Sequence, residues 1–251
     1  MREPDDKSAA FGFEQVAPAT KTARVKRVFD SVSPRYDLMN DLMSGGLHRL
    51  WKRYAVLHLK LRPGHRVLDL ASGTGDLARL LARHHRGLNE VIVCDINASM
   101  LARGRDRLHD DGLVAGLRFV QGNAEALPFA DGSIDRVIMG FGLRNVTFKT
   151  RALAEIARVL AAGGRVVILE FSRVRAPLLA RLYDAYSFQV LPRLGAVVAG
   201  DGDSYRYLAE SIRVHPDQEA FALMMERVGL SGVTHLDLLG GVVAVHAAWK
   251  F

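Results

Sequence analysis

The segment VLDLASGTGD, residues 67–76, is an apolar strand that ends in a turn containing two glycines. Gly73 and Gly75 let the backbone turn sharply and approach a ligand closely, because neither has a side chain. A second apolar run, residues 91–95, ends in Asp95 about 20 residues after the turn. A carboxylate at that place can accept hydrogen bonds from ribose hydroxyls. The pattern therefore predicts a site for a nucleoside-type cofactor.

The glycine motif alone also fits a dinucleotide site, since Gly73-x-Gly75-x-x-Ala78 leads into a predicted helix. Two acidic residues favour S-adenosylmethionine instead. Asp69, inside the strand, can orient the turn or meet the ammonium of a methionine moiety. Asp76 places a negative charge at the start of the helix, where a pyrophosphate would bind. S-adenosylmethionine has no phosphate, so this charge does not oppose it.

A third feature is the loop GNAEALPF, residues 122–129, which follows a predicted strand. Its Asn123 is suited to recognise the edge of an adenine. In an open α/β sheet, ligands bind at the carboxyl ends of the strands. Several polar or glycine-rich positions fall at such ends: the turn 73–75, Asp95, Asn123 and the segment GFGLRN at residues 140–145.

Alternating strand and helix patterns predict an α/β fold with a mostly parallel sheet and helices on both faces. Strands are expected at 67–71, 91–95, 117–121, 134–140, 165–171, 232–238 and 241–249, and helices at 21–30, 36–43, 47–59, 76–84, 98–110, 148–161 and 216–228. Residues 1–20 are expected to be loosely ordered, residues 161–164 to stop a helix, and residues 240–241 to form a hairpin turn. An apolar helical segment, 176–200, interrupts the alternation.

The composition limits the function. At 251 residues the chain fits one α/β domain with an appendage, and no apolar run reaches the roughly 18 residues of a membrane-spanning helix. The charged start of the chain argues against secretion. The single Cys94 reads as a buried small hydrophobic residue, and no cluster of metal ligands is expected. The net charge of +7 is compatible with solvated arginines or an anionic membrane surface. No nucleic-acid-binding module is recognised.

Beyond these patterns, the chain resembles the ubiquinone/menaquinone biosynthesis C-methyltransferases over residues 11–251. The segments that carry the resemblance are VFDSVSPRYDLMNDLMS (28–44), HRLWK (48–52), the glycine turn, FGLRNV (141–146), LEFS (169–172), YRYLAESI (205–212), HPDQ (215–218) and the C-terminal end. The first, fourth and sixth of these segments are highly specific, whereas the glycine turn indicates only the broad methyltransferase class.

The resemblance implies a class I, Rossmann-like S-adenosylmethionine-dependent methyltransferase with a seven-stranded sheet. Residues 1–60 would form a helical cap over the active site, and residues 61–251 the methyltransferase domain with an apolar helical insertion at about 176–213. Two positions depart from the family: Ser72 replaces a common glycine, and Gly140 stands where serine is frequent. Together with the motifs above, the predicted cofactor-binding residues are Asp69, Gly73, Thr74, Gly75, Asp95, Asn123, Ala124 and Gly140.

The resemblance also implies the reaction, the transfer of a methyl group to a ring carbon of a prenylated quinol. The substrate would be demethylmenaquinol, 2-polyprenyl-6-methoxy-1,4-benzoquinol, or both. Arg144 would stabilise the phenolate, since a guanidinium is a poor direct base. Asn145 would orient a ring oxygen or water, and Tyr36 would cap the pocket.

Each of these catalytic residues has a structural alternative. Arg144 could pair with Glu170, Asn145 could cap the following helix, and Tyr36 could be a core aromatic. His215 could act as a base, but its place before Pro216 favours a structural role. A nucleobase methyltransferase and a quinone-carrying scaffold are competing readings of the whole chain.

The expected partners follow from the apolar insertion and the basic charge. Residues 178–198 are either ordinary core or a wall that faces the membrane and receives the prenyl chain. We expect a cytoplasmic protein that associates transiently with the inner face of the cytoplasmic membrane. Other quinone-biosynthesis enzymes and a second copy of the chain are further candidate partners, and nucleic acid is not expected.

Overall fold

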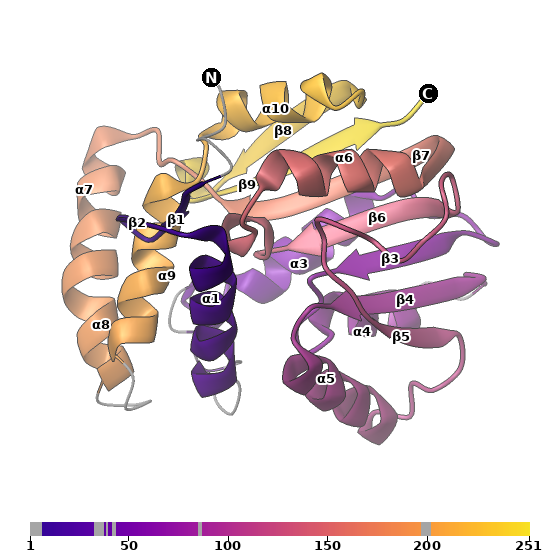
Figure 1. The fold of residues 1–251 in the computed structure, drawn as a ribbon, viewed down its shortest axis with the longest axis horizontal. Helices are drawn as coiled ribbons and strands as arrows, with labels where there is room; N and C mark the ends of the chain where they lie inside the picture. The colour runs from indigo at the N-terminus through magenta and orange to yellow at the C-terminus, as the bar shows by residue number, and fades with distance from the viewer. Residues whose placement is uncertain (1–6, 33–37, 39, 42–43, 85–86, 197–201) are drawn as a thin grey trace.

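The computed structural model describes residues 7–32, 38, 40–41, 44–84, 87–196 and 202–251, and its centre is one seven-stranded sheet (Figure 1). The strand order is β5-β4-β3-β6-β7-β9-β8. Only β9 runs antiparallel to its neighbours in this sheet. The strands are β3 (Arg66–Leu70), β4 (Glu90–Asp95), β5 (Leu117–Gln121), β6 (Ile134–Gly140), β7 (Leu160–Phe171), β8 (Ser231–Leu238) and β9 (Val243–Trp249). The mostly parallel α/β sheet expected from the sequence is confirmed.

Helices cover both faces of the sheet, because side chains along each buried strand alternate between two cores. In β3, Val67 contributes to the core beneath α3, α4 and α5, whereas Leu68 and Leu70 contribute to the core beneath α6 and α10. The helices are α3 (His48–His58), α4 (Asp76–His84), α5 (Ala98–Asp110), α6 (Lys149–Val159) and α10 (Gln218–Arg227). The α4 and α5 bounds match the sequence expectation.

The N-terminal residues are ordered where the structure describes them, so the expectation of a loose segment over 1–20 was wrong for residues 7–20. Strands β1 (Ala9–Phe11) and β2 (Glu14–Val16) pair as an antiparallel hairpin. Helix α1 (Pro18–Val32) follows at once. The hairpin packs on a helix about 200 residues further along the chain, since Phe11 stacks on Tyr207 with ring centroids 4.1 Å apart. Such a long-range contact leaves no local sequence pattern.

The apolar insertion forms the outermost helices on one side of the molecule (Figure 1). It consists of α7 (Pro177–Ala185), a π-helical turn (Tyr186–Val190) and α8 (Leu191–Leu194), followed by α9 (Gly202–Val214). Helix α9 is largely buried and lies between this outer layer and α1. In contrast, α7 has no buried residue.

Two turn predictions had different outcomes. Residues 161–164 do not stop a helix, because α6 already ends at Val159 and these residues belong to β7. The hairpin turn between β8 and β9 is confirmed, and Gly240 and Gly241 both have positive φ angles, +64° and +96°. These angles are accessible to glycine without steric strain.

Candidate active site

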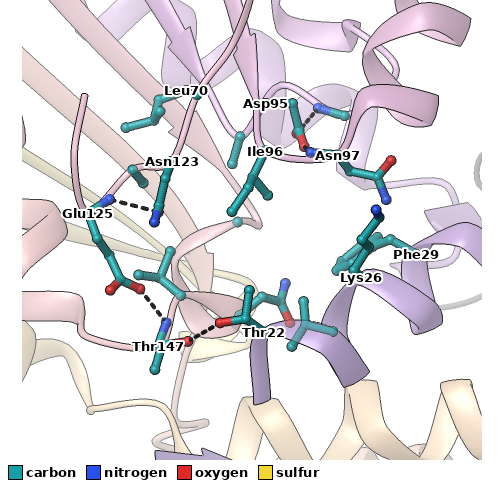
Figure 2. Close-up of a pocket in the computed structure, with 18 of the residues that line it drawn as sticks. Thr22, Lys26, Phe29, Leu70, Asp95, Ile96, Asn97, Asn123, Glu125 and Thr147 are labelled. Carbon is teal, nitrogen blue, oxygen red and sulfur yellow. Dashed lines mark hydrogen bonds between the residues drawn. The ribbon is translucent and has the colours of Figure 1, made fainter. Parts of the chain in front are cut away.

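A cavity of about 420 Å³ lies at the carboxyl ends of β3, β4 and β6, within the size range of small-molecule sites (Figure 2). One wall consists of the strand ends and the loops that follow them. The opposite wall is α1, which presents Thr22, Lys26 and Phe29 toward the strands. The convergence of strand ends predicted from the sequence therefore corresponds to a real cavity.

Asp95 holds the glycine turn, residues 73–75, at the cavity. The backbone N–H of Gly73 donates to Asp95 Oδ2 at 2.8 Å, and Ser72 N–H donates to Cys94 O at 3.0 Å. Gly73 and Gly75 have φ angles of +56° and +79°, the left-handed region that glycine adopts readily. Gly73 lines the cavity, but Gly75 lies behind it.

Asp95, one of two acidic residues that line the cavity, binds the glycine turn and the loop after β4. Its Oδ1 accepts from the N–H of Asn97 at 2.8 Å, and Oδ2 accepts from Gly73. The side chain is buried, and this burial raises the pKa of its carboxyl group, against the hydrogen bonds that lower it. A carboxylate oxygen can accept more than one hydrogen bond, so Asp95 keeps capacity for ligand hydroxyls.

Asp69 and Thr74, two predicted cofactor ligands, are placed behind the turn rather than in the cavity wall. Asp69 Oδ2 accepts from the N–H of Ala78 at 2.9 Å, so this residue orients the start of α4. Burial raises the pKa of Asp69 to about 8. The Thr74 hydroxyl accepts from Arg107 at 3.4 Å. Of the two roles considered for Asp69, the structure favours orienting the turn.

The start of α4 is unsuited to a pyrophosphate. Asp76 in its first turn is paired with Lys52 at 2.6 Å and with Arg107 at 2.8 Å. These two cations outweigh the burial and lower the pKa of Asp76 to about 2, so the carboxylate stays charged at neutral pH. A fixed negative charge there disfavours phosphate, which agrees with a cofactor that has none.

The loop after β5 contributes Asn123, Ala124 and Glu125 to the cavity. Asn123 Oδ1 accepts from the N–H of Glu125 at 3.0 Å. Glu125 Oε1 accepts from the backbone N–H group of Thr147 (Figure 2) and from that of Phe148, and both residues precede α6. One carboxylate therefore fixes the loop after β5 to the loop after β6.

At the ends of β3 and β6, two non-glycine residues adopt left-handed backbone conformations, Ala71 with φ +54° and Phe141 with φ +59°. Both line the cavity. The two strand ends approach so closely that a Cβ on Gly142 would lie 2.6 Å from the Ala71 Cβ. Helix α4 also lies close to the end of β6, since a Cβ on Gly140 would lie 2.9 Å from Leu77 Cδ1. Strain of this kind concentrates at functional sites.

Arg144 forms the buried ion pair with Glu170 that was the structural alternative to its catalytic role. Its Nη1 lies 2.8 Å from Glu170 Oε1, and the two side chains are only 4% and 2% exposed. The guanidinium also donates to the carbonyl of Phe141. Arg144 does not line the cavity. Its predicted contact with a phenolate is therefore absent from this arrangement, and its role in the reaction stays a prediction.

Asn145 does line the cavity. The prediction that it might instead cap α6 was wrong, because Phe148 occupies that position and makes no side-chain capping bond. Asn145 Oδ1 accepts from the hydroxyl of Tyr207 at 3.1 Å. Its Nδ2 is buried without an acceptor among the residues that the structure describes. A buried donor without an acceptor is energetically costly, and a ligand oxygen that reaches it would remove this cost.

Of the other two catalytic candidates, only His215 lies among the described residues. Tyr36 lies outside the described residues. His215 is buried outside the cavity wall and packs against Phe221, with ring centroids 5.5 Å apart. Burial and nearby cations place the pKa of His215 well below its usual value. This supports the structural reading of His215.

Helix α1 lies in the segment expected to cap the site, but its contacts with the loops at the strand ends were not predicted. Its N-terminal half is fastened to the loop after β6, since Thr22 and Thr147 hydroxyls lie 3.3 Å apart and Lys21 Nζ donates to Val146 O at 2.9 Å. Near its C-terminal end, Asp30 accepts from the Asn97 side chain at 2.8 Å. The apolar spacing of this segment predicted a helix, but spacing does not say what the polar face meets.

The strand order and the placement of the cavity define a class I S-adenosylmethionine-dependent methyltransferase fold. A SAM-dependent methyltransferase from Thermotoga maritima shares this fold, with a TM-score of 0.64 and 19% identity over 90% of this chain and all of the other. The chain belongs to the ubiE/COQ5 methyltransferase family, which it matches over residues 17–250.

Full-length relatives carry a more specific name. The ubiquinone/menaquinone biosynthesis C-methyltransferases UbiE of Edwardsiella ictaluri and Marinomonas sp. are 53% and 50% identical to this chain, and each match covers both proteins completely. The family resemblance recognised in the sequence is thus confirmed.

Proposed function

We propose that this chain transfers the methyl group of S-adenosylmethionine to a ring carbon of a prenylated quinol in ubiquinone and menaquinone biosynthesis. The observation that carries the proposal is the full-length match to relatives named for that activity. Demethylmenaquinol and 2-polyprenyl-6-methoxy-1,4-benzoquinol are the expected acceptors. The cavity supports this assignment because polar groups of the strand ends lie beside apolar side chains of α1.

S-adenosylmethionine supplies, when bound, an activated methyl group on a sulfonium. Asp95 would accept hydrogen bonds from the ribose hydroxyls, and Asn123 would meet the adenine edge. Gly73 leaves the backbone open to close approach. The absence of a side chain at Gly140 excludes a hydroxyl contact there, so that position would act through its backbone alone.

The ring of the quinol would lie against apolar side chains of the same cavity, which Val25, Phe29 and Phe141 line. A ring carbon becomes nucleophilic as an adjacent hydroxyl loses its proton, and a hydrogen-bond donor at that oxygen favours the loss. We assign this donor to Nδ2 of Asn145. Arg144 would not touch the quinol. It would support Asn145 from outside the cavity, where its buried ion pair with Glu170 holds it. Helix α1 would keep water from the reacting groups.

Turnover with each quinol tests the proposal. Purified protein is given S-adenosylmethionine labelled in the methyl group and each quinol separately, and the products are analysed by mass spectrometry. We expect one labelled methyl group on a ring carbon of at least one quinol. Binding of NADH without binding of S-adenosylmethionine would overturn the cofactor assignment, and cofactor binding without methylation of either quinol would overturn the substrate assignment.

We also propose that α7 rests on an anionic membrane surface at the cytoplasmic face, where prenylated quinols reside. Leu178 and Leu182, one helical turn apart, are 72% and 62% exposed on the outermost helix. Arg181 is exposed beside them and offers a charge of the sign that attracts anionic lipid. No helix within the described residues is both long and apolar enough to cross a membrane.

Vesicle co-sedimentation tests this surface. Burial of each leucine should contribute roughly 1.5–3 kcal/mol at most, so Leu178→Ser with Leu182→Ser should strongly reduce binding to vesicles containing phosphatidylglycerol. Added salt should weaken the preference for anionic over neutral vesicles. The matched control is Leu57→Ser with Leu223→Ser, which removes two other exposed leucines, 69% and 51% exposed, from α3 and α10. Equal binding by the α7 variant and the wild type would contradict the proposal.

A further inference from the structure

Outside the cavity, a line of contacts leads from Asn145 to the N-terminal hairpin. The hydroxyl of Tyr207, on α9, donates to Asn145 Oδ1 at 3.1 Å. The ring of Tyr207 in turn stacks on Phe11 of β1, with an interplanar angle of 14°. We propose that Tyr207, supported by Phe11, is a positioning residue that holds the Asn145 carboxamide with its NH2 group free for the ring oxygen of the quinol. This inference rests on the proposed function.

The hydrogen bond favours one orientation of the amide, because in the reversed orientation Tyr207 would accept from the NH2 group and its own buried proton would have no acceptor among the described residues. An asparagine side chain has an acceptor oxygen and a donor nitrogen that can exchange places by rotation. When the Tyr207 proton is committed to Oδ1, only the NH2 group is left for a ligand. Burial raises the pKa of Tyr207 above its usual value, so the hydroxyl keeps its proton at neutral pH. The reversed amide would turn an oxygen toward the developing negative charge.

Tyr207 itself is held from several sides. Its side chain is buried within α9, and Phe11 covers one face of its ring. The hairpin has a second attachment to the same helix, because the backbone N–H of Phe13 donates to Glu210 Oε2 at 3.3 Å. A Cβ on Gly12 would overlap this carboxylate, at 2.1 Å from Oε2. The hairpin therefore fits α9 closely on both sides of the tyrosine.

A purely structural role would give different kinetics from a positioning role. Loss of one preorganised donor at a developing charge lowers turnover by roughly 10²- to 10³-fold. Loss of its orientation alone should lower turnover by less, about ten- to a hundredfold. The effect should fall on kcat and leave S-adenosylmethionine affinity unchanged, since the side chains assigned to the cofactor, Asp95 and Asn123, lie at the ends of β4 and β5.

The experiment combines Tyr207→Phe, Asn145→Ala and the double variant. Turnover of the preferred quinol, cofactor affinity, melting temperature and the pH dependence of kcat are measured for each. We expect Tyr207→Phe to reduce kcat about ten- to a hundredfold, and to add nothing once Asn145 is alanine. The acidic limb of the kcat profile should move to higher pH, because the bound quinol loses its proton less readily.

Tyr205→Phe is the matched control. It also removes a buried tyrosine hydroxyl from α9, but the hydroxyl that bonds Asn145 belongs to Tyr207. Phe11→Leu is a second variant that keeps the Tyr207 hydroxyl but loosens the stack, and it should show a smaller loss in the same direction. Wild-type kcat in Tyr207→Phe, a loss that adds fully to that of Asn145→Ala, or an equal loss in Tyr205→Phe would overturn the inference. A wild-type protein that binds S-adenosylmethionine but methylates no quinol would instead overturn the proposed function.

Discussion

Removing the charge of Glu170 should destabilise the protein strongly, because its carboxylate is almost fully buried. Glu170 accepts from Arg144 Nη1 at 2.8 Å, from the backbone N–H of Arg144 at 3.1 Å and from that of Phe171 at 3.0 Å. Glu170→Gln would replace one acceptor oxygen by an NH2 group. This new donor would face the N–H groups that now donate to Glu170. It would also leave the Arg144 charge buried without its partner.

The size of the effect follows from the burial. Breaking a buried ion pair by changing one partner typically destabilises by about 3–5 kcal/mol. For a chain of this length, each kcal/mol lowers the melting temperature by about 2–4 °C, so we expect a decrease of roughly 6–20 °C. The comparison is Glu14→Gln, whose partner Arg24 lies 2.6 Å away but whose side chain is 67% exposed. An exposed pair contributes only about 0–1 kcal/mol.

Thermal unfolding and turnover, measured on the same variants, separate stability from catalysis. Arg144→Ala should lower the melting temperature as Glu170→Gln does, and we also expect it to spare cofactor binding and depress turnover. Arg144→Lys should recover only part of the turnover, because an ammonium keeps the charge but loses the forked donor geometry. A Glu170→Gln protein that melts within about 2 °C of the wild type would refute the buried-pair reasoning, and normal turnover in a stable Arg144→Ala protein would remove Arg144 from the reaction.

Two further substitutions test the cofactor half of the site. Asp95→Ala should weaken S-adenosylmethionine binding about ten- to a hundredfold in calorimetry, since hydrogen bonds to a charged acceptor contribute roughly 1.5–3 kcal/mol; unchanged affinity would exclude Asp95 from the site. Burial raises the pKa of Asp69 to about 8, so the folded chain keeps a proton that the unfolded chain loses above about pH 4. Stability should therefore fall as pH rises from about 4 to 8, and Asp69→Asn should flatten this slope in denaturant midpoints measured across that range; an unaltered slope would show that Asp69 does not cause it.

Local patterns were sufficient to predict the sheet, its alternation with helices and the glycine turn. Each depends on residues close together in the chain: apolar periodicity for β3 and α4, and a pair of glycines between them. The approach of Asp95 to the turn was also predictable, because parallel neighbouring strands end at the same edge. The Gly73–Asp95 hydrogen bond is the direct result.

What the sequence left undecided depends on partners distant in the chain. The sequence predicted either a phenolate contact or an ion pair with Glu170 for Arg144. The ion pair forms because the sheet places Glu170, 26 residues further along the chain, beside Arg144. Phe11 was expected in a loosely ordered segment, because its partner Tyr207 lies on α9, far along the chain, and leaves no local pattern around Phe11. Thr74 sits in the predicted turn, but only the path of the backbone decides that its side chain faces Arg107 rather than the cavity.

The two fastenings of α1 have a thermodynamic consequence. Thr22 ties the helix to the loop after β6, which carries the groups assigned to the quinol, and Asp30 ties it to Asn97 in the loop after β4, two residues beyond Asp95. A ligand that strengthens the Thr22–Thr147 or the Asp30–Asn97 hydrogen bond restricts the motion of α1. The other ligand must contact the same helix. The two binding free energies are then linked, and the linkage has the same magnitude in both directions. We therefore expect cofactor and quinol to influence each other's affinity, although Asp95 and Asn145, the side chains assigned to the two ligands, lie at different strand ends.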